Sequence, residues 1–366
     1  MTIFIVELII IFLGLCASAL LFWRVPLLPK RALVPPALRV SVIIPARNEA
    51  TTLPLLLSDL KQQTVTPYEI IVANDDSEDE TAEIARSFGV TVLSLREKPD
   101  GWVGKSWACH QGAAAASGDA FVFLDADVRL APEGLARILS AYAENGAVSV
   151  QPRHTTQKRY EQCSLIFNLV LIAANGTALP KPVHMSLFGP VIAISRENYA
   201  LAGGHEGTKS SVLEDMTFAN NLRRAKIPFR VFVGDAAVSF RMYASGFPAL
   251  LQGFTKNFAT GAVKTPAWLF LLVSLLITSI TSVAMHLIIS LARGEAVLLL
   301  LYGALYLIWV IALFLFSRKI GHYSPFAAVL YPVPLTVFLL VFLNSGIHRI
   351  FHIKVKWKGR AISLER

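Results

Sequence analysis

Long apolar runs divide the chain into three parts. The first run, 3–23, carries a single charge at Glu7, and three more lie close together at 267–292, 296–316 and 325–343. About 20 apolar residues are enough to cross a membrane as a helix. Between these runs, 40–265 alternates short β-branched stretches with helical patterns. The pattern therefore predicts an α/β domain in water, with membrane segments before and after it in the sequence.

The middle part predicts a mostly parallel sheet flanked by helices. The expected strands cover 40–44, 69–73, 90–95 and 120–124. Helical composition falls between them, at 51–63, 81–88 and 105–117, with caps expected at Thr51 and Ser77. In such sheets ligands bind beyond the carboxyl ends of the strands. The residues that follow each strand are therefore the first candidates for a site.

The expected organisation places the whole chain in the cell membrane as a multi-pass protein with a cytoplasmic α/β domain. No Lys or Arg precedes the first apolar run, whereas Arg24, Lys30, Arg31 and Arg39 follow it, and positive charge favours the cytoplasmic side. A cleaved signal peptide ending at Ala17-Ser18-Ala19 is the alternative. The predicted parts are a membrane anchor at 1–24, a domain at 40–265, membrane segments at 266–345 and a basic cytoplasmic tail at 346–366.

Two apolar stretches are ambiguous. Four crossings would place the basic tail outside, so one segment is expected not to span, and Pro332-Val333-Pro334 marks 325–343 as a broken or re-entrant element. The stretch 160–174 is either a core helix or a helix at the membrane surface, and the surface role is favoured.

Charge and cysteine content limit the binding partners and the structural sites that can be expected. The net charge is +9, but the basic residues collect beside the apolar runs and in 349–366, so anionic lipid is the expected partner and nucleic acid is not. Cys16, Cys109 and Cys163 are scattered, so neither a disulfide framework nor a zinc site is expected.

Acidic and polar residues follow three of the expected strands. They read Pro45-Ala46-Arg47-Asn48-Glu49, Asn74-Asp75-Asp76-Ser77 and Asp125-Ala126-Asp127. Carboxylates that share a cleft repel one another unless a cation occupies the gap, and Mn²⁺ or Mg²⁺ prefers such oxygen ligands. The sequence thus predicts a divalent metal at Asp125 and Asp127, with a plain turn after the strand as the alternative.

These motifs, with Gly104-Lys105 between them, resemble glycosyltransferase family two, the inverting enzymes with the nucleotide-binding GT-A fold. The resemblance covers nearly all of 40–262 and implies an α/β GT-A domain that binds a UDP-sugar. It implies Asp127 and Asp125 as metal ligands. The residues that it implies for donor binding are Pro45, Arg47, Glu49, Asp75, Lys105 and Asp125.

The second half of the domain carries motifs that the resemblance assigns to the acceptor. Leu213-Glu214-Asp215 stands where the family has its Ser/Thr-Glu-Asp motif, which implies Asp215 as the catalytic base, although Asp215 could instead cap a helix at 216–225. Gly203-Gly204-His205 is similar to the family's glycine pair, so Gly204, His205 and Glu214 are expected on the acceptor side, with a plain turn as the alternative. The Gln-x-x-Arg-Trp motif is replaced near 255–258, so a single transfer is expected rather than polymer synthesis.

The stretch from Gly101 to Ala108 and the apolar segments resemble the carotenoid branch of the family. The resemblance implies transfer of a sugar, glucose, to a hydrophobic acceptor such as a C30 carotenoid acid. A hopanoid, polyprenyl or ceramide-like lipid is the alternative acceptor, and a non-catalytic scaffold that binds sugar nucleotides is the alternative of another class. Trp102 and Trp107 are packing residues on the simpler interpretation. A carboxylic acid is ionised at neutral pH and needs no base, so Asp215 would then orient the acceptor or the donor.

Overall fold

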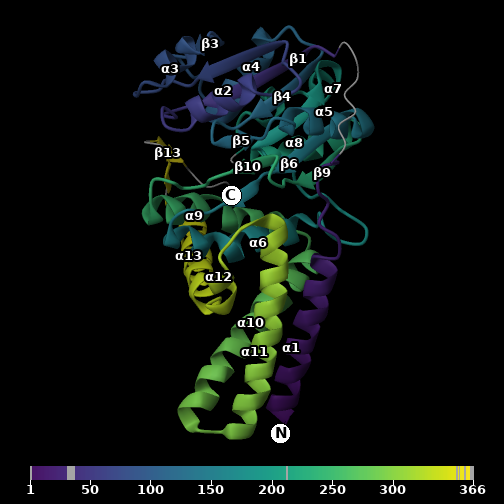
Figure 1. Ribbon diagram of the computed structural model, residues 1–366, viewed down its shortest axis with the longest axis vertical. Helices are drawn as coiled ribbons and strands as arrows, with labels where there is room; N and C mark the ends of the chain where they lie inside the picture. Colours follow the sequence, from purple (N-terminus) through teal and green to yellow (C-terminus); the bar gives the residue numbers. More distant parts are fainter. Residues whose placement is uncertain are drawn as a thin grey trace.

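The computed structural model describes residues 2–30, 38–211, 213–351, 353, 355–357 and 360–362. Of 2–3, 256–260, 355–357 and 360–362 it describes the backbone alone. Arg31, much of the basic tail and the side chains of 256–258 therefore lie outside the described residues. Figure 1 shows a domain of sheet and helices at one end and long helices at the other, among them α1 (Thr2–Leu21), α10 (Ala267–Arg293) and α11 (Ala296–Ile320).

A seven-stranded sheet in the order β3-β2-β1-β4-β8-β6-β9 forms the centre of the domain. Neighbouring strands are parallel except that β8 runs antiparallel to both β4 and β6. The prediction of a mostly parallel sheet is confirmed. The strands are β1 (Val40–Ala46), β2 (Glu69–Asn74), β3 (Thr91–Ser94), β4 (Ala120–Leu124), β6 (Ala147–Gln151), β8 (Val191–Ser195) and β9 (Arg230–Val233).

Helices cover this sheet and leave its middle strands inaccessible to solvent. Val42 and Val122, on β1 and β4, have no exposed surface, as expected of strands packed on both faces. Gly112 lets its helix, α4, pack closely on β1, since a Cβ there would lie 2.4 Å from Cγ2 of Ile43. The helices are α2 (Leu53–Lys61), α3 (Thr81–Ser87), α4 (Gly104–Ala115), α5 (Gly134–Asn145), α7 (Arg196–Leu201) and α8 (Glu214–Arg224).

The predicted helix caps at Thr51 and Ser77 are wrong. Helix α2 is preceded by Thr52 and helix α3 by Glu80, and neither residue makes a side-chain capping bond. The hydroxyl of Ser77 instead accepts a hydrogen bond from the backbone N–H of Asn48, 3.0 Å away in the next turn. Asp79 in the same turn bonds both ways, since its carboxylate accepts from the N–H of Ala50 at 3.1 Å and from the N–H of Thr81, the first residue of α3, at 3.1 Å.

A four-stranded sheet in the order β11-β7-β10-β5 joins the domain to the long helices. β11 follows α11 directly and pairs with β7 of the domain. Each strand has only two or three residues, too few for an alternating pattern to predict. The strands are β5 (Val128–Leu130), β7 (Arg153–Thr155), β10 (Val238–Phe240) and β11 (Gly321–His322).

The apolar stretch after β7 forms a 3-10 turn, η1 (Arg159–Ser164), and helix α6 (Leu165–Asn175). Figure 1 shows α6 and α9 (Phe247–Lys264) between the domain and the long helices. Most of α6 is buried, and Phe167 stacks on Phe254 of α9 with ring centroids 4.0 Å apart. The helix is thus part of the packed junction, and its placement at a membrane surface stays a prediction.

Four helices in the described residues are long and apolar enough to cross a membrane: Phe4–Leu21, Ala267–Arg293, Ala296–Ile320 and Pro332–Ile350. The segment expected to be broken does divide, into α12 (Pro325–Val329) and α13 (Pro332–Ile350). The break lies just before Pro332, because prolines are tolerated in the first turn of a helix, where no N–H is needed. How many of these helices cross a membrane stays a prediction.

One carboxylate links three of the long helices. Oε1 of Glu7 on α1 accepts hydrogen bonds from Ser282 Oγ at 2.8 Å and Tyr302 Oη at 2.9 Å, and lies 2.8 Å from His286 Nδ1. The His286 ring stacks on that of Tyr302, with centroids 5.1 Å apart. Glu7 is in the N-terminal half of α1, and the N-terminal end of this helix is remote from the sheet (Figure 1). These four residues are called the membrane polar cluster below.

Candidate functional site

Three turns that carry predicted site residues open at one edge of the main sheet. They follow β2, β1 and β4, which are adjacent and parallel. Nη1 of Arg47 donates hydrogen bonds to the carbonyl oxygens of Asp75 at 2.7 Å and Asp76 at 2.8 Å. The backbone N–H of Asp75 donates to the carbonyl of Ala46 at 2.8 Å. The structure thus brings the predicted residues Arg47 and Asp75 together.

A cavity of about 190 Å³ lies beside the turn after β2. Asn74, Asp76 and Arg86 contribute to its lining, while Asp75 next to it is buried with 5% of its surface exposed. The side-chain oxygen of Asn74 is buried and accepts no hydrogen bond within the described part of the chain. The turn therefore offers polar atoms that a ligand with N–H groups could satisfy.

Pro45 and Glu49 lie in the same region. Pro45 is part of β1, opposite Ala73 of β2. The N–H of Glu49 donates to the hydroxyl of Thr81 at 2.8 Å, and its carboxylate accepts a hydrogen bond from the Thr52 hydroxyl. These contacts fix the turn after β1, and the donor-binding roles of Pro45 and Glu49 stay predictions.

The first turn of α4 places Lys105 against the residue that follows β4. Nζ of Lys105 lies 2.7 Å from Oδ1 and 3.0 Å from Oδ2 of Asp125. Burial lowers the pKa of Lys105, but the charges of Asp125, Asp215 and Glu214 raise it more, so that it ends above its ordinary value. The site therefore contains a permanent ammonium ion surrounded by carboxylates.

Asp215 lies in the first turn of α8, and its side chain points to the segment before β8. Gly189 donates its N–H to Oδ2 of Asp215 at 3.1 Å, and Asp125 donates its N–H to the carbonyl of Pro190 at 2.9 Å. A Cβ on Gly189 would lie 2.6 Å from Oδ1 of Asp215, so a larger residue there would displace the carboxylate. Leu213 precedes the helix instead, and the alternative that Asp215 caps α8 is wrong.

The surroundings of Asp215 favour its neutral form. Burial raises the pKa of Asp215, the charge of Glu214 raises it further and that of Lys105 lowers it, with the result that it reaches about 7. At neutral pH this carboxyl group is therefore divided between its two protonation states. Such a group can either accept or donate a proton in a hydrogen bond to a ligand.

Gly204 and His205 form a packed support near the same helices. Gly204 has φ +51°, and a Cβ there would lie 2.6 Å from the ring of Tyr199. The His205 ring is buried against Phe123, and its Nδ1 lies 3.0 Å from the Tyr199 hydroxyl. Burial lowers the pKa of His205 to about 3, so the ring is neutral. Contact of Gly204, His205 or Glu214 with an acceptor stays a prediction.

The residues that could hold a metal are Asp125 and Asp127. No three His, Cys, Asp or Glu side chains form a group that could hold a metal ion by themselves, within the part of the chain that the structure describes. Mg²⁺ sites at nucleotides use one or two carboxylates, and water and phosphate oxygens complete the shell. The carboxylates of Asp125 and Asp127 could therefore hold a divalent ion if water and the oxygens of a bound diphosphate supplied its remaining ligands.

Sequence reasoning missed three residues at this edge. Gly189 contacts Asp215, Tyr199 holds His205, and the charge of Asp127 acts on the buried hydroxyl of Tyr243. Burial, with a further contribution from Asp127, raises the pKa of Tyr243 above its ordinary value. For Gly189, the sequence offered one signal, the Gly189-Pro190 pair just before the apolar run that begins at Val191.

Trp102 and Trp107 form an aromatic cluster beside Lys105. Their ring centroids lie 5.1 Å apart, and each ring also packs against His110, at 5.0 and 6.1 Å. The N–H of Val103 donates to the carbonyl of Lys209 at 2.7 Å. These contacts agree with the interpretation of both tryptophans as packing residues that fix the start of α4.

Comparison with known proteins adds to this geometry. The family model of glycosyl transferase family 2 matches residues 41–196. The chain is 36% identical over 339 residues to 4,4'-diaponeurosporenoate glycosyltransferase of Staphylococcus haemolyticus (strain JCSC1435), covering 89% of each chain. It is 34% identical over 367 residues to the enzyme of the same name from Staphylococcus aureus (strain USA300), covering 98% of this chain and 97% of the relative.

A solved structure shares the fold. It is a mannosyltransferase of Pyrobaculum calidifontis in complex with GDP-Man and Mn²⁺, with a TM-score of 0.57 and 18% identity, covering 94% of this chain and 99% of that one. The sheet with its helices is therefore a GT-A fold, as predicted. Since the family model matches the strands that carry the site, and the relatives are matched over nearly their whole length, the chain is a member of glycosyltransferase family 2.

Proposed function

We propose that this glycosyltransferase moves glucose from a UDP-sugar onto a C30 carotenoid carboxylic acid related to 4,4'-diaponeurosporenoate. The relatives named for that acceptor match the chain over its domain and its long helices alike. A carotenoid is soluble in lipid, and four apolar helices adjoin the domain. The expected setting is a cell membrane with the domain in the cytoplasm, where nucleotide sugars are found.

The observation that carries this proposal is the group of charges at the sheet edge. Lys105 is held between carboxylates, directly after a strand that ends in Asp125-Ala126-Asp127. Such a group is suited to a diphosphate that carries negative charge and brings a cation with it. A site for a neutral ligand would gain nothing from this arrangement.

Each part of the edge has a proposed role in binding the donor. Asp75 and the cavity beside it receive the nucleobase, with Arg47 holding the turn. Lys105 exchanges its contact with Asp125 for the diphosphate, which becomes the leaving group. Asp127 and Asp125 would hold Mn²⁺ or Mg²⁺, which supplies further neutralisation of the diphosphate charge when bound. The related fold solved with GDP-Man and Mn²⁺ motivates this assignment.

The proposed reaction is one direct displacement. A carboxylate oxygen of the acceptor attacks the anomeric carbon from the face opposite the diphosphate, and the bond to the diphosphate breaks with both electrons leaving on its oxygen. The product is a glycosyl ester with inverted configuration and UDP. Charge is conserved without any proton transfer, because the acceptor enters as an anion and the leaving group departs with that charge.

Asp215 has a different role for an acid than for an alcohol. An ionised Asp215 would repel an acceptor carboxylate, whereas a protonated Asp215 would donate a hydrogen bond to it. Its pKa of about 7 makes the protonated form available at neutral pH. We therefore assign Asp215 to hold the acceptor carboxylate beside the anomeric carbon. For a hydroxyl acceptor, the ionised form would act as a general base.

The proposal can be tested with membranes that contain the chain. They are incubated with labelled UDP-glucose or labelled GDP-mannose and a panel of lipids: the C30 acid, a hopanoid, a polyprenol and a ceramide. Label from UDP-glucose on the C30 acid, as an ester that mild alkali releases, is the expected result. Label on another lipid only would replace the acceptor, and label from GDP-mannose only would replace the donor.

A further inference from the structure

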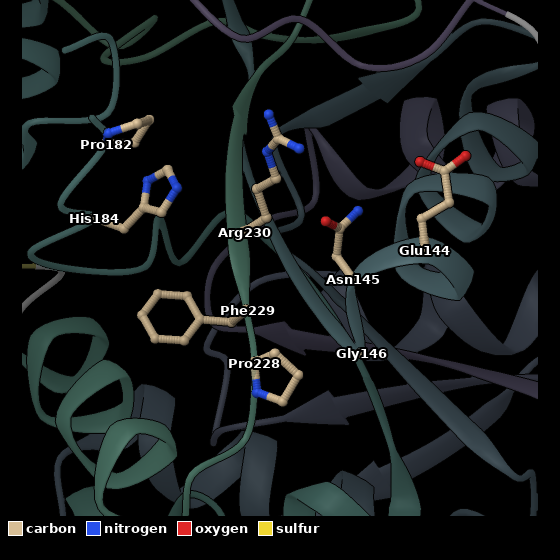
Figure 2. Close-up of a pocket in the computed structure, with 8 residues that line it drawn as sticks. All are labelled: Glu144, Asn145, Gly146, Pro182, His184, Pro228, Phe229 and Arg230. Atoms are coloured by element: carbon tan, nitrogen blue, oxygen red, sulfur yellow. The ribbon is translucent and has the colours of Figure 1, made fainter. Parts of the chain in front are cut away.

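A cavity of about 430 Å³ lies on another flank of the domain and shares no lining residue with the site described above. It is formed by the end of α5, the start of β9 and the loop before β8. Figure 2 shows Pro182 and His184 on one side, Asn145 and Glu144 on the other, and Arg230 between them. No step of the proposed transfer uses this cavity.

The walls of the cavity are tied to the near ends of the membrane helices. Arg24, just past the end of α1, donates its N–H to the carbonyl of Ala178 at 3.0 Å, in the loop that leads to His184. A Cβ on Gly176 in the same loop would contact Leu269 of α10 at 3.5 Å. β9 is joined to the chain after α1 by a bond from Val233 N–H to the carbonyl of residue 26, at 2.7 Å. The cavity walls are therefore connected to the ends of α1 and α10 nearest the domain, which the predicted membrane placement of these helices puts at the level of lipid headgroups.

The cavity is electropositive on one side and apolar on the other. The guanidinium of Arg223 packs over the Phe229 ring at 5.3 Å and donates to the carbonyl of His184. Arg230 lines the cavity and makes no ion pair within the described part of the chain, and Glu144 is the single acidic residue of the lining. Pro182, Pro228 and Phe229 provide the apolar wall.

The positive charge of this region also affects the pKa of the His184 ring. Burial, with further contributions from the charges of Arg230 and Arg223, lowers the pKa of His184 to about 4. Nδ1 of His184 is buried without a hydrogen-bond partner among the described residues. The two arginines thus act on a neutral ring that can donate or accept a hydrogen bond, and a bound anion would relieve the repulsion between the cations.

We propose that this cavity binds the headgroup of an anionic phospholipid. Arg230 pairs with the phosphate, Arg223 adds to the positive potential, and His184 supplies a hydrogen bond. The apolar wall of Phe229 and its neighbouring prolines receives the glycerol and the first acyl carbons. A free phosphate shares the charge of this ligand, but it would leave the apolar wall unused and would not need a place at the membrane.

The test measures lipid binding by the full chain, after its purification in detergent has removed native lipid. Short-chain phosphatidylglycerol and phosphatidylcholine with the same acyl chains are titrated against the wild type, Arg230→Gln and Arg230→Lys. Removing one cation at a membrane surface is expected to weaken phosphatidylglycerol binding about fivefold in Arg230→Gln. Arg230→Lys should retain most of the affinity, and phosphatidylcholine binding should not change.

Lys61→Gln is the matched control, because Lys61 is an exposed cation on α2 and lies outside the cavity lining. It should bind phosphatidylglycerol as the wild type does. The proposal is overturned if Arg230→Gln binds phosphatidylglycerol as tightly as the wild type, or if Lys61→Gln is weakened equally. It is also overturned if inorganic phosphate displaces the lipid at equal concentration. Since the readout is binding without any sugar donor, failure here is distinct from failure of the proposed transfer.

Discussion

Carboxylates at the sheet edge and in the membrane polar cluster are neutralised in different ways. At the sheet edge a single ammonium ion, that of Lys105, faces Asp125, Asp215 and Glu214. Among the long helices one oxygen of Glu7 is already surrounded by three polar side chains from α10 and α11. The first group has more negative charge than its own cation balances, whereas the second is paired internally.

The predicted placement of the long helices in a bilayer, and of the sheet edge in water, accounts for the difference. Water and a charged ligand can complete the shell of a carboxylate at the sheet edge, so an excess of negative charge can persist there. In a bilayer no water is available, and an ionisable side chain must find its partners in the protein. The excess charge is therefore the feature that supports the proposed binding of a ligand and a cation there, and the paired cluster is a contact between helices.

Among the substitutions, removing the ammonium ion should have the largest effect. In Lys105→Gln the leaving diphosphate loses a fixed positive charge, and kcat/KM should fall about 10²- to 10³-fold, as for loss of one electrostatic contact in other enzymes. Steady-state kinetics with labelled UDP-glucose measure this. Lys61→Gln serves as the control on a distant surface, and a Lys105→Gln enzyme with near wild-type turnover would show that the diphosphate binds elsewhere.

Removing the divalent ion should also stop turnover. Chelation is expected to reduce activity to background and added Mn²⁺ or Mg²⁺ to restore it, because the acidic excess at the edge needs a cation when the diphosphate binds. In Asp127→Asn the metal concentration for half-maximal activity should rise about 10- to 100-fold. Full activity of the chelated wild type would contradict the metal assignment.

Asp215→Asn separates the two kinds of acceptor. With a carboxylic acid, asparagine can still donate a hydrogen bond, so kcat should fall by less than about 10²-fold, whereas loss of a general base costs about 10²- to 10⁴-fold. The direction in which kcat/KM changes with pH distinguishes the two roles further. If the protonated form works, wild-type kcat/KM falls as pH rises through about 7. If Asp215 were a general base, kcat/KM would instead rise with pH. In either case, kcat/KM of the asparagine variant should not change with pH in this range.

Glu7→Ala should leave the reaction intact and weaken the bundle. Three polar groups would lose their shared acceptor. An average hydrogen bond between membrane helices contributes about 0.6 kcal/mol, so the free energy of unfolding should fall by roughly 2 kcal/mol. A lower midpoint of thermal unfolding in lipid, with kcat and KM within about twofold of wild type, is expected. A large loss of turnover with unchanged stability would place the membrane polar cluster in the reaction instead.

Ser282→Ala is the smallest change, because it removes one of the donors to Glu7 and leaves Tyr302 and His286 in place. A loss of about 0.6 kcal/mol is expected. A double-mutant cycle with Glu7→Ala checks it: the effect of Ser282→Ala should vanish when Glu7 is absent. An effect that persists in the double variant would mean that Ser282 acts through other contacts.

The sequence predicted four of the seven strands of the main sheet, β1 to β4, because their patterns are local, and it did not predict β6, β8 or β9. Asp125-Ala126-Asp127 and the turn around Asp75 could be found by reading forward from each strand. Their mutual placement followed from the rule that parallel strands end at one edge. The direction of β8 could not be predicted, since strand direction depends on connections that no local pattern records.

Contacts between segments that are distant in the sequence could not be predicted either. Glu7 was recognised as a lone charge in an apolar run, but its partners Ser282 and Tyr302 lie 275 and 295 residues away. Gly189 is required only because Asp215, in a later helix, comes within contact of its backbone. The cap predictions failed for the same reason, as Ser77 bonds to a neighbouring turn. Each depends on tertiary packing that overrides a local preference.

The most direct test of the account uses a matched pair of acceptors. Purified chain in lipid, with Mn²⁺ and labelled UDP-glucose, is offered the C30 carotenoid acid or the alcohol made by reducing its carboxyl group. The account predicts label on the acid as a glycosyl ester and little on the alcohol, since Asp215 and Lys105 would receive an anion at this edge. Efficient labelling of the alcohol with none of the acid would contradict it.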